Sequence, residues 1–286
     1  DRAALGYKDE VPFVGYDLWN HYEFSFMQPS GVPFQGMLQL RYSSDSAHLI
    51  ESKSLKLYLN SLADYESTEA AIQSVIKEDL DPLLGEVFVV IFSFEQGEKM
   101  FQLDPRLTAS LLEKMIKAVQ PFSAFTVAPP LKTATEKIYG SHLLQSCCKV
   151  TGQPDWGSAW IRLKGTKHPD SGELMAYILS FRNRHHFHEE VAERMLDDLL
   201  RAFAPDELEI RLNYTRRGGL DINPVRLYPR GQLAGMDDKT RTDHVAALAK
   251  ISPDQATNIR AMIAKADLST EQALTAFTAK LRNFAE

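Results

Sequence analysis

Two adjacent cysteines, Cys147 and Cys148, lie in a loop with glycine and proline that leads into an alternating stretch near Ala159. A loop at the end of a strand can hold a thiol in a fixed yet reachable position. Cysteine is a nucleophile only as the thiolate, so it needs a group that takes its proton or lowers its pKa. Asp155, seven residues after Cys148, and the later His188 could serve. The alternative is a buried small apolar role, which the polar neighbours disfavour.

The sequence contains neither a spaced zinc-ligand pattern around the cysteines nor a glycine-rich dinucleotide-binding motif. Adjacent cysteines cannot comfortably share one tetrahedral zinc ion, whose ligands come at spaced positions, so we expect no metal site. A G-x-G-x-x-G run between a strand and a helix does not occur in the sequence. Any nicotinamide cofactor must therefore be held by other residues.

A second polar cluster ends in His188, Glu189 and Glu190, where a strand is expected to give way to a helix. Free N–H groups and partial positive charge at a helix start favour glutamate there whatever the function. Helix capping is therefore one interpretation of Glu190. His188 and Glu189 gain a chemical role if they meet the cysteine loop in space.

Residues 50–58 and 215–224 combine cations with serine or glycine. Side chains such as Lys56 and Arg217 could bind the phosphates of an anionic ligand, and Gly218 would let the backbone approach it. The alternative for each cation is a solvated surface.

Apolar periodicity predicts the elements that position these clusters. Alternation of apolar and polar residues indicates antiparallel strands with one wet face. Apolar residues at helical spacing indicate two amphipathic helices, each followed by a strand. The expected strands cover residues 38–42, 87–94, 159–163 and 208–214, and the expected helices cover residues 72–80 and 191–203.

The two halves of the chain resemble each other. Residues 57–62 match residues 176–181 at an offset of 177 − 58 = 119. Such a repeat indicates two modules of β-β-α-β type, at about 12–100 and 140–235. The predicted fold class is α+β, with antiparallel sheets layered with helices.

We predict three parts in the chain: residues 1–125, an N-terminal module with its linker; residues 126–239, a C-terminal catalytic module; and residues 240–286, a helical extension. In the extension, Ser252 and Ser269 each begin a capping box, which indicates short helices. Few large apolar residues follow, so we expect this appendage to pack on the main body or on a partner protein.

Composition narrows the function class. The 286 residues are 44% hydrophobic and 24% charged, as in an ordinary globular protein rather than a disordered chain. With 32 Lys and Arg against 38 Asp and Glu, the net charge of −6 gives no global field for nucleic acid. Apolar runs are too short for a membrane helix, and two adjacent cysteines cannot cross-link distant segments. We therefore expect a cytoplasmic location.

Taken in order, the polar segments resemble the NADPH-dependent 7-cyano-7-deazaguanine reductases, the nitrile reductases of the queuosine pathway, in their two-module form. The matching runs are residues 51–58, 148–156, 187–189 and 216–219, within a resemblance that covers about residues 12–235. The resemblance implies two tandem tunnelling-fold modules, a homodimer, and a 7-deazaguanine substrate rather than nucleic acid. The helical tail departs from the family pattern.

The resemblance also implies a covalent mechanism. Cys148 would add to the nitrile carbon and form a thioimide, while Asp155 would donate and accept the proton. His188 would orient the reacting group or relay protons. Hydrides from two NADPH would take the thioimide to the imine and then to 7-aminomethyl-7-deazaguanine.

Binding roles follow from the same resemblance. Glu51 and Glu189, one from each module, would accept hydrogen bonds from the N–H edge of the deazaguanine. The implied substrate contacts are Ile50, Glu51, Ser52, His188 and Glu189. The implied NADPH contacts are Ser52, Lys53, Arg217 and Gly218.

Two other functions stay open. A relative with the same fold could form the thioimide but let an amine nitrogen attack it, as an amidinotransferase; the implied NADPH contacts argue against this. A non-catalytic deazaguanine-binding adaptor could dock a partner through the tail. The intact set of Cys148, Asp155 and His188 disfavours the adaptor.

Overall fold

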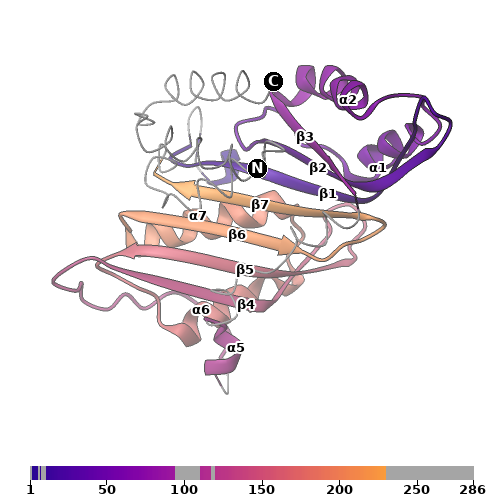
Figure 1. Ribbon diagram of the computed structural model, residues 1–286. Coiled ribbons are helices and arrows are strands. Elements are labelled where there is room, and N and C mark those ends of the chain that lie inside the picture. The colour runs from indigo at the N-terminus through magenta and orange to yellow at the C-terminus, as the bar shows by residue number, and fades with distance from the viewer. Residues whose placement is uncertain (1, 6, 8–10, 94–109, 117–119, 230–286) are drawn as a thin grey trace.

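The computed structural model describes residues 2–5, 7, 11–93, 110–116 and 120–229 of the chain. Its strands form one seven-stranded antiparallel sheet in the order β3-β2-β1-β7-β6-β5-β4 (Figure 1). The strands are β1 (Val14–Met27), β2 (Pro33–Ser43), β3 (Val87–Phe92), β4 (Thr135–Cys147), β5 (Pro154–Gly165), β6 (Glu207–Tyr214) and β7 (Leu220–Tyr228). The α-helices are α1 (Ser52–Ser61), α2 (Glu69–Leu84), α5 (Leu112–Met115), α6 (Ser171–Leu179) and α7 (His188–Phe203), and the 3-10 helices are η1 (Arg2–Leu5) and η2 (Ser180–Asn183).

The predicted α+β class is confirmed. The four expected strands correspond to β2, β3, β5 and β6, and the two expected helices lie within α2 and α7. The apolar stripe that predicted each helix is fully buried in α7 and partly buried in α2, where Val75 and Leu80 are half-buried. In α7 this stripe includes Val191, Leu199 and Phe203, and in α2 it includes Ile72 and Ile76.

The order strand-strand-helix-helix-strand occurs twice, as β1-β2-α1-α2-β3 and as β4-β5-α6-α7-β6. The second helices of the two halves begin at Glu69 and His188, 188 − 69 = 119 residues apart. The prediction of one helix in each half was wrong, because α1 and α6 precede the longer helices. Only Leu55 and Leu59 are buried in α1, too few to reveal its period.

One continuous sheet joins the two halves, since β1 pairs with β7 from Val14↔Leu227 to His21↔Leu220. Directly opposed residues point to the same face of a sheet. By this register, the core of the first half under α1 and α2 and the core of the second half under α6 and α7 lie on one face. The helix starts of both halves therefore share that face.

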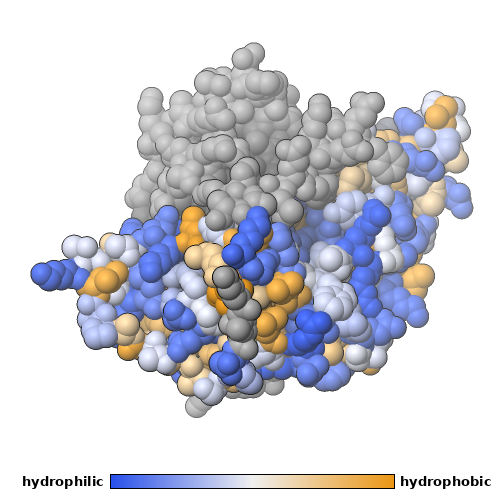
Figure 2. Space-filling view, turned by 90° about the horizontal axis from the view of Figure 1, so that it is seen from below, coloured by the Kyte–Doolittle hydropathy of each residue, from blue (hydrophilic) through white to orange (hydrophobic). Residues whose placement is uncertain are grey.

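The expected extension at residues 240–286 lies outside the described residues. Among the described helices, none combines the length and apolarity needed to cross a membrane. In the view of Figure 2, hydrophilic residues dominate the coloured surface, and hydrophobic residues form small scattered groups.

Candidate active site

A tight hairpin turn between β4 and β5 positions the candidate nucleophile. The backbone N–H of Cys148 donates to the carbonyl of Gln153 at 2.8 Å, and that of Gly152 donates to the carbonyl of Cys148 at 2.9 Å. Gly152 has φ +69°, a left-handed conformation that favours glycine. Because Asp155 is the second residue of β5, the turn holds the thiol and the carboxyl group at the same end of the sheet.

The Cys148 thiol is half-buried and is a free cysteine. Burial raises its pKa, as does the nearby charge of Asp155, but hydrogen bonds to the sulfur outweigh both. These bonds come from the Thr151 side chain and from the backbone of Thr151 and Val150, so the net pKa lies below the ordinary value. The turn thus stabilises the thiolate, which is the reactive form.

Asp155 is buried, with 5% of its surface exposed. Burial raises the pKa of its carboxyl group, but His188 and Arg217 lower it further than burial raises it. His188 Nε2 lies 3.4 Å from Asp155 Oδ2, and Arg217 Nη1 is hydrogen-bonded to Oδ1. Asp155 is therefore held as a carboxylate within electrostatic reach of the thiol.

His188 is the first residue of α7, and its ring stacks on Tyr214 with centroids 3.6 Å apart and planes at 11°. The Tyr214 hydroxyl lies 3.4 Å from Ser146 Oγ. His188 Nδ1 is buried and has no hydrogen-bond partner among the described residues. The imidazole therefore directs Nε2 toward Asp155, and Nδ1 is available for a hydrogen bond to a ligand.

Glu189, the next residue of α7, is buried. Burial, with a further contribution from the negative charge of Asp17, raises the pKa of its carboxyl group to about 8. Behind it, Arg226 Nη1 lies 2.7 Å from Asp17 Oδ1, and Arg226 Nη2 lies 3.0 Å from Glu193 Oε1. The carboxyl group of Glu189 is therefore largely protonated at neutral pH.

Glu51 has a different environment, because it is exposed and caps α1. Its carboxylate accepts from Lys53 N at 3.0 Å and from Ser54 N at 2.7 Å. These backbone hydrogen bonds, that of Lys53 first, hold the pKa of Glu51 below its ordinary value. In the described part of the chain, no contact joins Glu51 to Glu189.

The buried phenol of Tyr42 links the two substrate segments instead. Tyr42 lies beside the backbone of Ile50 and within electrostatic reach of Glu189. Ile50 itself packs against the core of the first half. The starts of α1 and α7 therefore approach the same region from the two halves.

The turn between β6 and β7 carries Arg217, Gly218 and Gly219, with φ +55° and +85° at the two glycines. A Cβ added to Gly218 would lie 3.2 Å from Lys56 Nζ, and one added to Gly219 would lie 2.5 Å from Glu23 Oε2. The turn thus packs closely on α1, whose exposed first residues are Ser52 and Lys53. This arrangement of cations and bare backbone suits the phosphates of a nucleotide cofactor.

Two family models match the chain: "Nitrile reductase, 7-cyano-7-deazaguanine-reductase N-term" over residues 1–91 and "QueF-like protein" over residues 154–232. The NADPH-dependent 7-cyano-7-deazaguanine reductase of Coxiella burnetii (strain Dugway 5J108-111) is 44% identical over 218 residues, covering 75% of this chain and 77% of that protein. This chain belongs to the 7-cyano-7-deazaguanine reductase family. The reductase of Azoarcus sp. (strain BH72) is 40% identical over 237 residues, 82% of this chain and 83% of that protein.

Another relative with the same name, from Xanthomonas campestris pv. campestris (strain 8004), is 40% identical over 230 residues, 80% of this chain and 83% of that protein. A crystal structure of the archaeosine synthase QueF-Like in the apo form aligns with 36% of this chain and 96% of that chain, at 16% identity and a TM-score of 0.30. That alignment is too weak to bear on fold or function.

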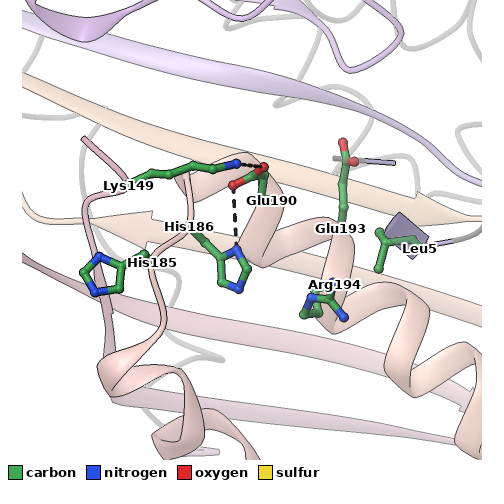
Figure 3. Close-up of a pocket in the computed structure, with 7 residues that line it drawn as sticks. All are labelled: Leu5, Lys149, His185, His186, Glu190, Glu193 and Arg194. Atoms are coloured by element: carbon green, nitrogen blue, oxygen red, sulfur yellow. Dashed lines mark hydrogen bonds and ion pairs between the residues drawn. The ribbon is translucent and has the colours of Figure 1, made fainter. Parts of the chain in front are cut away.

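A cavity of about 220 Å³ lies beside the cysteine turn of this reductase-family chain, on the side of Lys149 (Figure 3). Lys149 Nζ and His186 Nδ1 both face Glu190, at 2.8 and 3.7 Å from its carboxylate oxygens. Glu190 also accepts from the backbone N–H of Phe187 at 3.0 Å, as the capping interpretation predicts. None of the expected site residues lines this cavity.

Sequence reasoning missed two contributors to the site. Thr151 donates to the Cys148 sulfur. Its position three residues after Cys148, within the run 148–156, was the sequence feature that could have indicated this role. Tyr214 stacks on His188, but in the sequence it ends an alternating strand and nothing marks it as different from a core residue.

Proposed function

We propose that this chain catalyses the NADPH-dependent four-electron reduction of 7-cyano-7-deazaguanine to 7-aminomethyl-7-deazaguanine through a covalent thioimide on Cys148. Family membership supports the substrate and the cofactor. The observation that carries the chemistry is the half-buried Cys148 at the same end of the sheet as the ionised carboxylate of Asp155 and within its electrostatic reach, with the imidazole of His188 3.4 Å from that carboxylate.

In the addition step, the Asp155 carboxylate accepts the thiol proton, and the sulfur of Cys148 forms a bond to the nitrile carbon. One π bond of the nitrile becomes an N–H bond when Asp155 returns that proton to the nitrogen. A nitrile is a poor hydride acceptor, and covalent capture divides its reduction into easier steps.

When bound, NADPH supplies the hydride for each of two successive reductions. Asp155 and His188 hold the protons that the substrate nitrogen needs in these steps. Cys148 leaves as the thiolate once the first reduced adduct collapses to the imine. The lowered pKa of that thiol favours its departure.

Substrate recognition is assigned to the starts of α1 and α7. Glu189 and Glu51 accept from the N–H edge of the deazaguanine, His188 faces the reacting group, and Ile50 and Ser52 flank Glu51. An acceptor in a buried site discriminates against bases that lack the matching donors, because it would be left unpaired. The burial of Glu189 supports this role.

Cofactor binding is assigned to Ser52, Lys53, Arg217 and Gly218. The close packing of Gly218 on Lys56 supports this assignment. It places the glycine turn between β6 and β7 against α1, the helix that also carries Ser52 and Lys53. Lys56 is only loosely paired, its Nζ lying 3.9 Å from Glu23 Oε2. It is therefore free to contribute to phosphate binding.

We also propose that the two halves are tandem tunnelling-fold modules, with the boundaries predicted above, in a cytoplasmic homodimer. The repeated order of elements supports the modules. Light scattering of the purified chain tests the dimer. A partner of residues 240–286 remains a prediction.

Absorbance of NADPH during incubation with the nitrile tests the function. Two NADPH should be consumed for each nitrile, and intact mass should show a nitrile adduct that is absent in Cys148→Ala. Cys147→Ala is the matched control and should keep the adduct. Adduct formation with no cofactor consumption would favour the amidinotransferase, and an unchanged wild-type mass would favour the adaptor.

A further inference from the structure

Arg217 lies between the two sites assigned above. It belongs to the turn that packs on α1, yet its guanidinium reaches Asp155 through Nη1 and Gln153 Oε1 through Nη2, the latter at 2.5 Å. The Arg217 side chain is 42% exposed, whereas that of Asp155 is 7% exposed. A ligand arriving from solvent can therefore reach the arginine without entering the buried site.

Among the described residues, two groups contact the carboxylate of Asp155 and two more interact with it electrostatically. His188 comes from α7, Arg217 from the β6–β7 turn, Cys148 from the β4–β5 turn, and Tyr214 from β6. Arg217 is the permanent cation among them. Its ion pair favours the ionised carboxylate.

An ionised Asp155 suits one half of the reaction only. It is the right form for accepting the thiol proton during addition of Cys148. It is the wrong form for giving a proton to nitrogen during the hydride steps. Those steps occur only when the cofactor, whose phosphates compete for Arg217, is bound.

We propose that Arg217 is a positioning residue that sets the direction of proton transfer at Asp155: it clamps the carboxylate before the cofactor binds, and it moves to a cofactor phosphate afterwards, which leaves Asp155 free to act as an acid. This inference rests on the proposed function. No proton is gained or lost in the exchange itself. The thiol proton taken up during addition returns to the nitrogen, and each later proton comes through Asp155 from solvent.

The test is the pH dependence of thioimide formation without NADPH, measured by quenching and intact mass at nitrile concentrations that saturate the protein at every pH, so that the titration of Glu189 on substrate binding does not enter the rate. In wild type, the rate should rise with pH as Asp155 ionises. In Arg217→Gln, this acid limb should move up by about one pH unit, so that the rate on the limb falls about tenfold. Arg216→Gln is the matched control, because Arg216 lies over the Tyr22 ring at 4.7 Å and has no contact with Asp155 among those described.

Oxidised NADP+ is the probe for the cofactor, since it has the phosphates but no hydride to give. Saturating NADP+ should move the acid limb of wild type upward and leave that of Arg217→Gln in place. Arg217→Lys keeps the charge, so its acid limb should lie between those of wild type and Arg217→Gln. A full yield of adduct at high pH shows that each variant is folded. A profile of Arg217→Gln that coincides with wild type would overturn the inference, as would an equal NADP+ effect in both. Wild type without any adduct would overturn the proposed function as well.

Discussion

The imidazole of His188 lies flat on the ring of Tyr214, with centroids 3.6 Å apart. His188 begins a helix and Tyr214 ends a strand, so the stack joins α7 to β6 beneath the Asp155 contact. An aromatic pair of this kind adds about 0.5–1.5 kcal/mol beyond burial. It fixes the imidazole plane before any substrate arrives.

We expect Tyr214→Leu to lower kcat by up to about tenfold, which is the value of one stacked pair. Tyr214→Phe keeps the ring and loses only the 3.4 Å contact with Ser146 Oγ, so its kcat should stay near that of wild type. Steady-state kinetics at saturating nitrile measure both variants. Equal losses in the two would show that the hydroxyl, and not the stack, matters.

Thr151→Val should make Cys148 less reactive near neutral pH. The hydroxyl of Thr151 donates to the sulfur and lowers its pKa, so its removal raises the pKa and reduces the thiolate fraction. Iodoacetamide alkylation in a Cys147→Ala background should slow by roughly tenfold, the value of a hydrogen bond to a charged group. Thr151→Ser retains the donor and should alkylate at the wild-type rate; slowing in both would contradict this account.

Binding of 7-cyano-7-deazaguanine should tighten as the pH rises toward 8. Burial raises the pKa of Glu189 to about 8, so below that pH the free protein must lose a proton before the carboxylate can accept from the substrate. Affinity should therefore fall by about tenfold for each pH unit below this value. Calorimetry with Cys148→Ala avoids the covalent step. In Glu189→Gln binding should be weaker and independent of pH in this range; a persisting slope would assign it to another group.

Arg226→Met should destabilise the fold strongly. Arg226 is fully buried and pairs with Asp17 and Glu193, so its loss leaves the buried Asp17 carboxylate without its counterion and Glu193 with Arg2 as its remaining cation. Breaking a buried pair costs about 3–5 kcal/mol in the free energy of unfolding. Urea denaturation measures this loss. Lys164→Met removes an exposed partner of Glu207 and should change stability little; similar losses in both would refute the argument from burial.

The sequence predicted the local part of the site better than the distant part. Cys148 and Asp155 flank one hairpin turn, so their spacing alone places them together. Arg217, which pairs with Asp155, is 217 − 155 = 62 residues beyond it, and charge indicated a phosphate contact rather than an ion pair with the carboxylate. Register between β5 and β6 decides that contact, and it is not readable from periodicity.

The environment of Glu189 was beyond prediction for a similar reason. Its pKa depends on Asp17, in the first strand of the other half, and on how deeply α7 is covered. Glu51 has the same residue type, yet it is an exposed helix cap. Two glutamates predicted to act as a pair therefore differ in charge state, because burial is a property of the assembled chain.

The ladder between β1 and β7 makes the halves poor candidates for separate expression. Eight residue pairs link them, from Val14↔Leu227 to His21↔Leu220. A fragment cut near residue 125 would leave each of these strands with a bare row of amide and carbonyl groups, and such edges recruit other chains into aggregates. If the two fragments are produced together in one cell, β1 of one fragment can pair with β7 of the other. We therefore expect a split form of the enzyme to reassemble, although each fragment alone would aggregate.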